Sequence, residues 1–363
     1  MKLRGAKYSL QLGLLLALLG LSSINAGACR LLPIPPGSEN VFWVHVEGPC
    51  LPGEETALAV KGADLLEALV QGKRIDLEHV LVVDQVMLDL LPQQALSEYP
   101  AIPPSVRKPL KEKGITAVRV IPEAISIRHS RFEKVLATNL VEGALLILGT
   151  VDFTGTVFQQ SIDLSKTVFV GPVRFSHARV DFEGFFIGSQ FAQGVDFSQV
   201  IFGTHSRFHQ AQFRDRVTFA DAHFTGVAEF LEVEFQQAAD FSRTAFASGT
   251  GFSGSVFKGP ADFSGISAVH EIYFRFTEFR ESVTFAQAQF HTVVDFSNAR
   301  FGGAKDFSGA EFRTMPELTG SNLPLDVVPV QNGRRLYGQV GIFLGLVILV
   351  LCYLWLSKGK KTA

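Results

Sequence analysis

The stretch "VDFSQVIFGTHSRFHQAQFRDRVTFADAHF", from Val195 to Phe224, places phenylalanine at alternating intervals of five and six residues. The same rhythm extends from residue 153 to residue 312, where thirty positions fit it without a slip. Phenylalanine fills 27 of these positions, and the exceptions are Leu164, Val180 and Ala268. Since the whole chain has 33 phenylalanines, this one repeat accounts for most of them.

A second column of residues lies two positions before the first. In 29 of the thirty units it holds Ala, Val, Thr, Ser, Ile or Gly, and Lys305 is the exception. A large residue at i and a small or β-branched one at i−2 lie on the same face of a β-strand. Gly, Ser, Asp, Asn and Gln crowd the positions between, as is typical of turns. The pattern predicts a very short strand and a tight turn in every unit.

The spacing also predicts how these units are arranged. Residues spaced alternately by five and six do not stay on one face of a helix with 3.6 residues per turn, which excludes an α-helix. Four units span 22 residues, so we expect a coil with four short sides whose successive turns stack at the strand spacing of about 4.8 Å. Residues 153–312 would then make about seven turns and a rod about 35 Å long.

The units "ADFSGISA" (261–268) and "KDFSGAEF" (305–312) resemble the pentapeptide-repeat proteins in their phenylalanine-rich form with 11-residue double units. The resemblance covers about 160 residues, from 153 to 312. It implies an all-β solenoid, a right-handed quadrilateral β-helix, in which the residues at i and i−2 point inward and phenylalanines of successive turns stack. The expected core ladder on one side comprises Phe153, Phe197, Phe219, Phe241, Phe263, Phe285 and Phe307.

The segments around the repeat suggest a domain order. Residues 29–123 are expected to form an N-terminal α/β cap, with a helix over about residues 63–70 and a Pro-rich insertion, because an uncovered β-helix end exposes strand edges. Residues 124–312 form the predicted repeat domain, regular from residue 153. Residues 313–335 contain three prolines and are expected to be a linker.

The N-terminus has the pattern of a signal peptide over residues 1–28. Basic residues at positions 2–7 precede an apolar stretch at 10–21 and small residues at 26–28. Two alternatives stay open, an uncleaved membrane anchor and a lipid attached to Cys29. The lipid alternative fits poorly, because Asn25 and Ala26 stand where an aliphatic residue is usual.

The C-terminus predicts a single transmembrane helix over residues 336–357, since residues 340–356 carry no charge. Lysines in residues 358–363 favour a short cytoplasmic tail. The predicted localisation is therefore the cell membrane, with one span and most of the chain extracytoplasmic. In that compartment Cys29 and Cys50 could form a disulfide, whereas Cys352 would be free in the membrane helix.

No catalytic or cofactor-binding motif is present in the sequence, so we predict neither an enzyme nor a cofactor. His205 and His209 are four residues apart, but a coil with five-residue sides is not expected to bring them together as a helix would. We therefore predict no metal site.

The residue before the inward phenylalanine is acidic in several turns of one side. These residues are Asp196, Asp240, Asp262 and Asp306. They could form an interaction stripe for a basic partner or cations. The simpler interpretation, which we favour, is that these carboxylates accept hydrogen bonds from turn amides or face water.

The predicted function is a non-enzymatic structural or protein-interaction scaffold, anchored to the membrane, with an unknown envelope protein as partner and an open oligomeric state. The net charge of −2 argues against nucleic-acid binding. One alternative, taken from the family resemblance, is a DNA mimic that binds topoisomerases, although residues 152–312 carry 18 acidic and 12 basic residues, only a net −6. The other is a carbohydrate-active envelope β-helix, for which a coil with such short sides offers little concavity.

Overall fold

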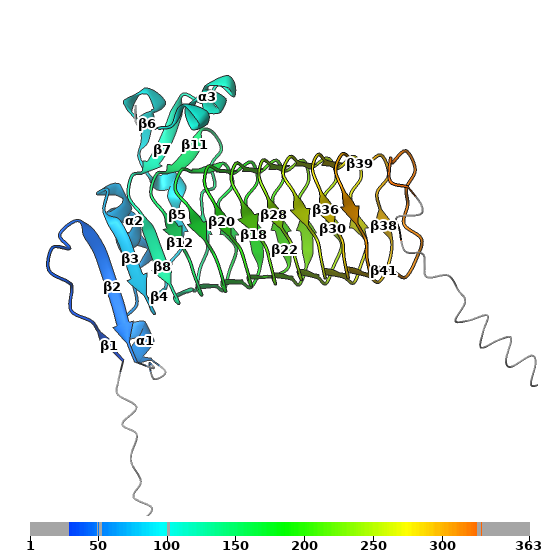
Figure 1. The fold of residues 1–363 in the computed structure, drawn as a ribbon. Coiled ribbons are helices and arrows are strands. Elements are labelled where there is room, and N and C mark those ends of the chain that lie inside the picture. Colours follow the sequence, from blue (N-terminus) through cyan, green and yellow to red (C-terminus); the bar gives the residue numbers. More distant parts are fainter. Residues whose placement is uncertain (1–28, 49, 51–52, 100–101, 325–327, 329–363) are drawn as a thin grey trace, which may run out of the picture.

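Strand pairing repeats every 22 residues through most of the chain. The computed structural model describes residues 29–324 and 328, except 49, 51–52 and 100–101 (Figure 1). From residue 151 onward each strand pairs in parallel with the strand 22 residues later, as in the pairs Val151 with Val173 and Phe158 with Val180. The result is a β-solenoid of about nine turns with four sides, each side a sheet.

We number the sheets in the order in which the chain visits them. Sheet 1 contains β1 (Arg30–Leu31), β2 (Val41–Glu47), β3 (Arg74–Glu78), β8 (Ile125–Arg128), β12 (Val151–Asp152), β16 (Val173–Arg174), β20 (Val195–Asp196), β24 (Val217–Thr218), β28 (Ala239–Asp240), β32 (Ala261–Asp262), β36 (Val283–Thr284) and β40 (Lys305–Asp306). Sheet 2 contains β4 (Leu81–Val82), β9 (Arg131–Phe132), β13 (Val157–Phe158), β17 (Arg179–Val180), β21 (Ile201–Phe202), β25 (His223–Phe224), β29 (Ala245–Phe246), β33 (Ser267–Ala268), β37 (Gln289–Phe290) and β41 (Glu311–Phe312).

Sheet 3 contains β5 (Val86–Met87), β10 (Leu136–Ala137), β14 (Ile162–Asp163), β18 (Glu183–Phe185), β22 (His205–Arg207), β26 (Val227–Glu229), β30 (Thr250–Gly251), β34 (Ile272–Tyr273) and β38 (Val294–Asp295). Sheet 4 contains β6 (Gln93–Ala95), β7 (Ala117–Ile121), β11 (Ala144–Ile147), β15 (Thr167–Phe169), β19 (Gln190–Phe191), β23 (Gln212–Phe213), β27 (Glu234–Phe235), β31 (Val256–Phe257), β35 (Glu278–Phe279) and β39 (Arg300–Phe301). The helices are α1 (Glu54–Ala57), α2 (Gly62–Val70) and α3 (Pro104–Glu112), with 3-10 turns at Leu88–Leu90 and Leu96–Glu98.

The interior of the solenoid is filled by stacked phenylalanine rings. Along sheet 1 the rings of Phe219 and Phe241 stack with centroids 4.8 Å apart and an interplanar angle of 7°. The phenylalanine rings along sheet 3 contact those along sheet 1 edge to face. For example, the ring centroids of Phe208 and Phe219 lie 5.5 Å apart, with an interplanar angle of 88°. Both geometries are the ones that aromatic quadrupoles favour. The seven residues named for the core ladder, Phe153, Phe197, Phe219, Phe241, Phe263, Phe285 and Phe307, are all buried.

The alternation of five and six residues comes from two kinds of corner. At a five-residue interval the chain makes a tight turn, in which the Ala222 amide donates to the Phe219 carbonyl at 3.0 Å. The third residue of that turn, Asp221, has φ +57°, which marks a type II turn. Gly and Gln are common at this corner position, and even Phe276 adopts φ +55° there. The other corners take the longer, six-residue interval.

Two insertions interrupt the 22-residue register near the N-terminal end. Ile125 pairs with Val151, 26 residues away, because four extra residues lie between β10 and β11. Ile75 pairs with Ile125, 50 residues away, because 28 extra residues between β5 and β7 include β6 and α3. Both insertions enter at the corner between sheets 3 and 4, and α3 with β6 projects from that side of the solenoid (Figure 1).

Before the first turn, β2 extends sheet 1 by pairing in parallel with β3, and β1 pairs antiparallel with β2. The helix α2 lies against β3 and β5. Its Leu65 and Leu69 are buried and line a small interior space of about 20 Å³ together with Ile75 and Phe132.

The predicted localisation needs correction. Within the part of the chain that the structure describes, no helix is long and apolar enough to cross a membrane. This finding overturns the prediction of a single-pass membrane protein. The segments on which that prediction rested, residues 1–28, 336–357 and 358–363, lie outside the described residues.

Truncation of a ladder residue should unfold the solenoid at lower denaturant concentration. We expect Phe208→Ala to lower the free energy of unfolding by about 3–5 kcal/mol, since its ring is fully buried between neighbours. Phe208→Leu should cost less, because Leu164 already occupies the same ladder two turns earlier. Urea titration followed by circular dichroism measures both, with Phe182→Ala, at a 47% exposed position, as the control. A loss no larger for Phe208→Ala than for the control would contradict the ladder as the main source of stability.

Candidate functional site

The four carboxylates of the predicted stripe lie along the outer face of sheet 1. Asp240 pairs directly with Asp262 in the parallel register. Thr218 separates Asp240 from Asp196, and Thr284 separates Asp262 from Asp306. The stripe is therefore one continuous row in which threonine interrupts the acidic residues.

Each of these aspartates holds the corner that follows it. The Oδ1 atom accepts a hydrogen bond from the amide of the serine two residues later, at 2.9 Å for Asp196 and at 2.8 Å for Asp240, Asp262 and Asp306. Hydrogen bonds from the backbone amide and the hydroxyl of Ser308 hold the pKa of the Asp306 carboxyl below its usual value. A structural role is thus present at every stripe position, and at Asp262 and Asp306 it leaves Oδ2 without a hydrogen bond from any described residue.

The same face is hollowed over seven turns. Two adjoining hollows of about 450 and 470 Å³ share Ala238 and Asp240. We call their combined length the sheet 1 groove; it is formed by residues 172–174, 194–196, 216–218, 238–240, 260–262, 282–284 and 304–306. The face is hollow because the middle residue of the first six triplets is buried and many of the flanking side chains, such as Gly194, Ala238 and Ala304, are small. Lys305, the middle residue of the last triplet, is partly exposed.

Charge is distributed unevenly along the sheet 1 groove. In its first half Arg174 and Arg216 balance Asp196 and Asp240. In its second half the lining contains Asp240, Asp262 and Asp306 against Lys305, a net charge of −2. Arg243, which is ion-paired with Asp221 outside this lining, also attracts Asp240 and Asp262. The acidic character predicted for the whole stripe therefore belongs to the second half.

A second group of polar residues lies on the outer face of sheet 3, where none was predicted. Oε2 of Glu229 lies 2.8 Å from Nε2 of His205, 3.0 Å from Nε of Arg207 and 3.2 Å from Nε2 of His209. The expectation that the two histidines lie apart is therefore wrong: His205 on β22 and His209 just after it both lie beside the Glu229 carboxylate of the next turn. The Arg207 guanidinium also lies 5.4 Å from the centre of the Phe185 ring.

This arrangement stabilises the ionised form of Glu229. Burial is the largest single influence and by itself raises the pKa of Glu229, but the hydrogen bonds from His205 and Arg207 and the charge of His209 outweigh it, so the pKa lies below its usual value. Among the described residues no group of three or more His, Cys, Asp or Glu side chains could hold a metal ion.

A similar arrangement occurs three turns further along sheet 3. The Arg275 guanidinium lies 4.7 Å from the centre of the Tyr273 ring, and its Nε donates to Asp295. Oδ1 of Asp295 accepts from the Ser297 amide at 2.8 Å. Burial, again the largest influence, raises the pKa of Asp295, yet the bonds from Ser297 and Arg275 together hold it below its usual value.

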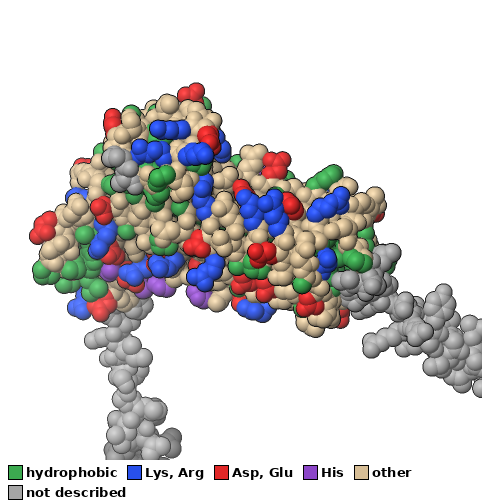
Figure 2. Space-filling view, turned by 45° about the horizontal axis from the view of Figure 1, so that its top comes forward, with side chains coloured by type: hydrophobic (Ala, Val, Ile, Leu, Met, Phe, Trp, Pro, Cys, Tyr) green, Lys and Arg blue, Asp and Glu red, His purple; other side chains and the backbone are tan. Residues whose placement is uncertain are grey.

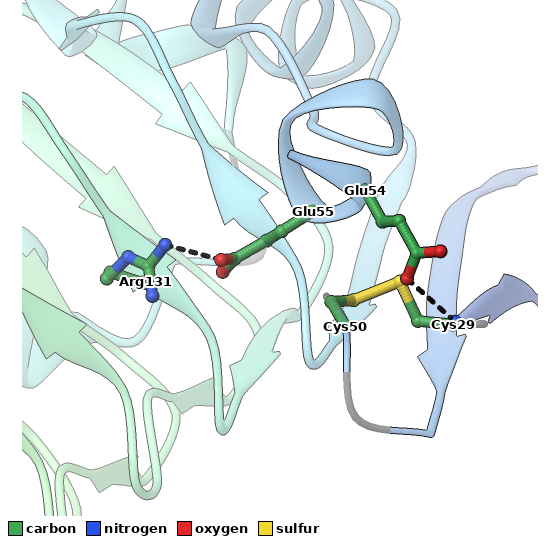
Figure 3. The surroundings of a disulfide bond; sticks show 5 residues. All are labelled: Cys29, Cys50, Glu54, Glu55 and Arg131. Carbon is green, nitrogen blue, oxygen red and sulfur yellow. Dashed lines mark hydrogen bonds and ion pairs between the residues drawn. A yellow bond between two sulfur atoms is a disulfide. The ribbon is translucent and has the colours of Figure 1, made fainter. Parts of the chain in front are cut away.

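The two cysteines for which a disulfide was expected are joined in the structure. Cys29 and Cys50 are linked just before α1, and the Cys29 amide donates to Oε2 of Glu54 at 3.4 Å (Figure 3). The neighbouring Glu55 reaches Arg131 of β9 at 2.7 Å. These contacts tie the N-terminal strands to the first turns of the solenoid.

The sequence contains a signal for the sheet 3 groups that the expectation of separate histidines overlooked. Arg207 and Glu229 are 22 residues apart, which is one turn, and the histidines flank Arg207 by two residues on each side. The register therefore indicates which outward residues are neighbours. It does not indicate that both imidazole rings turn toward Glu229.

Comparison with known proteins identifies the repeat. A family model described as Pentapeptide repeats (9 copies) matches residues 219–267. Searches of curated proteins and of solved structures found no match.

The lowered pKa of Asp295 makes a prediction about pH. A carboxyl whose pKa is lower in the folded than in the unfolded chain adds stability above the unfolded value of about 4, and this stability is lost as the pH falls through the folded value. Asp295→Asn should therefore cost about 1–2 kcal/mol at pH 7, and the difference from the wild type should shrink below about pH 4. Asp262→Asn, with the same turn bond but no ion pair among the described residues, is the control. Urea titrations from pH 7 to pH 2.5 test this, and a pH-independent difference would contradict it.

The disulfide should stabilise the N-terminal strands. It closes a segment of 21 residues, so replacing both cysteines by serine should cost about 3 kcal/mol in the opening of β1 and β2. Amide hydrogen exchange of β2 measures this opening. A reducing agent should speed exchange in the wild type to the rate of the variant and leave the variant unchanged; equal rates in oxidised wild type and variant would refute the prediction.

Proposed function

Because this chain is a pentapeptide-repeat protein whose repeats form a β-solenoid, we propose that it is a non-enzymatic scaffold that binds an extended segment of a partner protein. The site of binding is the sheet 1 groove, and the partner segment is basic where it lies on Asp240, Asp262 and Asp306. The observation that carries this proposal is the continuity of the groove over seven turns.

The dimensions support an extended polypeptide as the occupant. Seven stacked turns at about 4.8 Å span about 29 Å, which is the length of about nine residues of extended chain. Carboxylates on one half of the groove favour lysine or arginine in the corresponding half of the partner and would fix its direction. The Oδ2 atoms of Asp262 and Asp306, which no described residue engages, are available as acceptors.

The same proposal assigns the N-terminal region the role of a cap. Leu65 and Leu69 of α2 pack against the core at the first turn, and the disulfide holds β1 and β2 in place. Covering this end protects strand edges that would otherwise pair with other chains. We include the right-handed sense of the coil, expected from the family, in this proposal.

Site-specific photocrosslinking in cells tests the proposed binding. A photoreactive residue in place of Ser282, exposed within the groove, should capture one reproducible partner, whereas the same residue in place of Ser267 on sheet 2 should not. Asp240→Asn with Asp262→Asn keeps the turn acceptors but removes two charges, so the yield from position 282 should fall about tenfold.

Asp163→Asn is the matched control. On sheet 3, Oδ1 of Asp163 accepts the same kind of hydrogen bond, from the Ser165 amide two residues later. Its crosslinking yield should equal that of the wild type. Equal capture from positions 282 and 267, or a yield indifferent to the charges of Asp240 and Asp262, would refute the groove as the binding site.

A further inference from the structure

A third hollow lies where the two insertions meet the regular solenoid. It has a volume of about 320 Å³ and lies between α3, the loop of residues 138–143 and the outer face of sheet 4. Both insertions that depart from the 22-residue register enter at this corner, in consecutive turns. In repeat proteins such insertions commonly build the binding face.

The hollow has apolar walls because the insertion covers an apolar strip of sheet 4. Leu96, Val106 and Leu110 of the insertion are buried against outward residues of sheet 4, among them Leu146 and Val168. At the edge of the insertion, the walls of the hollow are formed by Leu110, Ile115, Ala144 and Val168. Val141, at the edge, is 88% exposed.

The polar groups of the hollow are mainly donors. Nζ of Lys166 donates to the carbonyls of Leu140 and Val141 at 2.9 and 3.1 Å, and no described residue accepts its third hydrogen. Gln190 is buried at 4% exposure; its Oε1 accepts from Arg214, and its Nε2 has no partner among the described residues. Lys113 also lines the hollow, and within the described chain neither lysine has a carboxylate within 4 Å.

Positive charge extends beyond the hollow. Residues 107–113, in α3 and just after it, contain one arginine and three lysines against one glutamate. Figure 2 shows Lys and Arg side chains gathered on the projecting insertion. The acidic residue of the hollow, Glu142, is exposed at its edge, so the interior favours an anion.

We propose that this hollow binds a small carboxylate with an apolar tail. The tail contacts the walls at Leu110, Ile115 and Val168, and the carboxylate accepts from Lys113, Lys166 and Gln190. The volume of about 320 Å³ falls within the range of small-molecule sites, about 300–1,000 Å³. This inference is independent of the sheet 1 groove, which lies on another side of the solenoid.

Isothermal titration of the full-length protein with octanoate tests the proposal. We expect saturable binding of one octanoate per chain, with affinity about tenfold or more above that of octanol and octylamine, which lack the negative charge. Butyrate should bind more weakly than octanoate, because each buried methylene adds about 0.8 kcal/mol.

The double variant Lys113→Gln with Lys166→Gln locates the site. Glutamine suits position 166, since Gln199, Gln210 and Gln287 adopt the same positive φ. The variant should weaken octanoate binding about tenfold or more, whereas Lys108→Gln with Lys111→Gln, which removes two charges from α3 outside the hollow, should change it less than about twofold. Circular dichroism shows whether both variants are folded.

Each other outcome would overturn the proposal. Failure of octanoate to saturate the wild type would exclude the ligand class. Equal affinity for octylamine would exclude the carboxylate contact, and this comparison does not depend on any variant. Equal loss in the two double variants would place the binding elsewhere or reduce it to general charge attraction.

Discussion

The structure depends on the stacking of buried phenylalanine rings in successive turns. Ring centroids in successive turns lie 4.4–5.3 Å apart, close to the spacing of hydrogen-bonded strands, so one 22-residue turn satisfies ring stacking and strand pairing together. An extra residue within a side would move its inward side chains to the outer face. For this reason the 4 and 28 extra residues of the two insertions enter at a corner, where they leave the ladders in register.

The corners impose their own chemistry, which explains residues that otherwise look functional. The tight corner needs a positive φ at its third position, and glycine or glutamine often supplies it. An aspartate before the inward phenylalanine bonds to the corner amide, as Asp240 does with Ser242. The acidic stripe is thus in the first place a set of carboxylates that support corners, and the binding role that we propose for it rests on the groove around it.

Because the ladders determine the inward residues, the outward residues are free to vary from turn to turn. On sheet 3 this freedom places Glu229 among His205, Arg207 and His209, and Asp295 beside Arg275. On sheet 1 it leaves small side chains and hence the groove, and on sheet 4 it leaves the apolar strip that the insertion covers. The three surfaces differ in charge, so the solenoid has chemically distinct sides.

The period of five and six residues was enough to predict the solenoid, its four sides and the inward rows, because a strand directs alternate residues to opposite faces and the turn length determines which residues stack. The same register indicated that Arg207 and Glu229 are neighbours. Only the tertiary structure decided that His205 and His209 both turn toward Glu229, and that Leu110 and Ile115 meet Ala144 and Val168 around a hollow. Those contacts depend on side-chain rotamers and on how a non-repeating segment packs across a sheet, and neither follows from a repeat length.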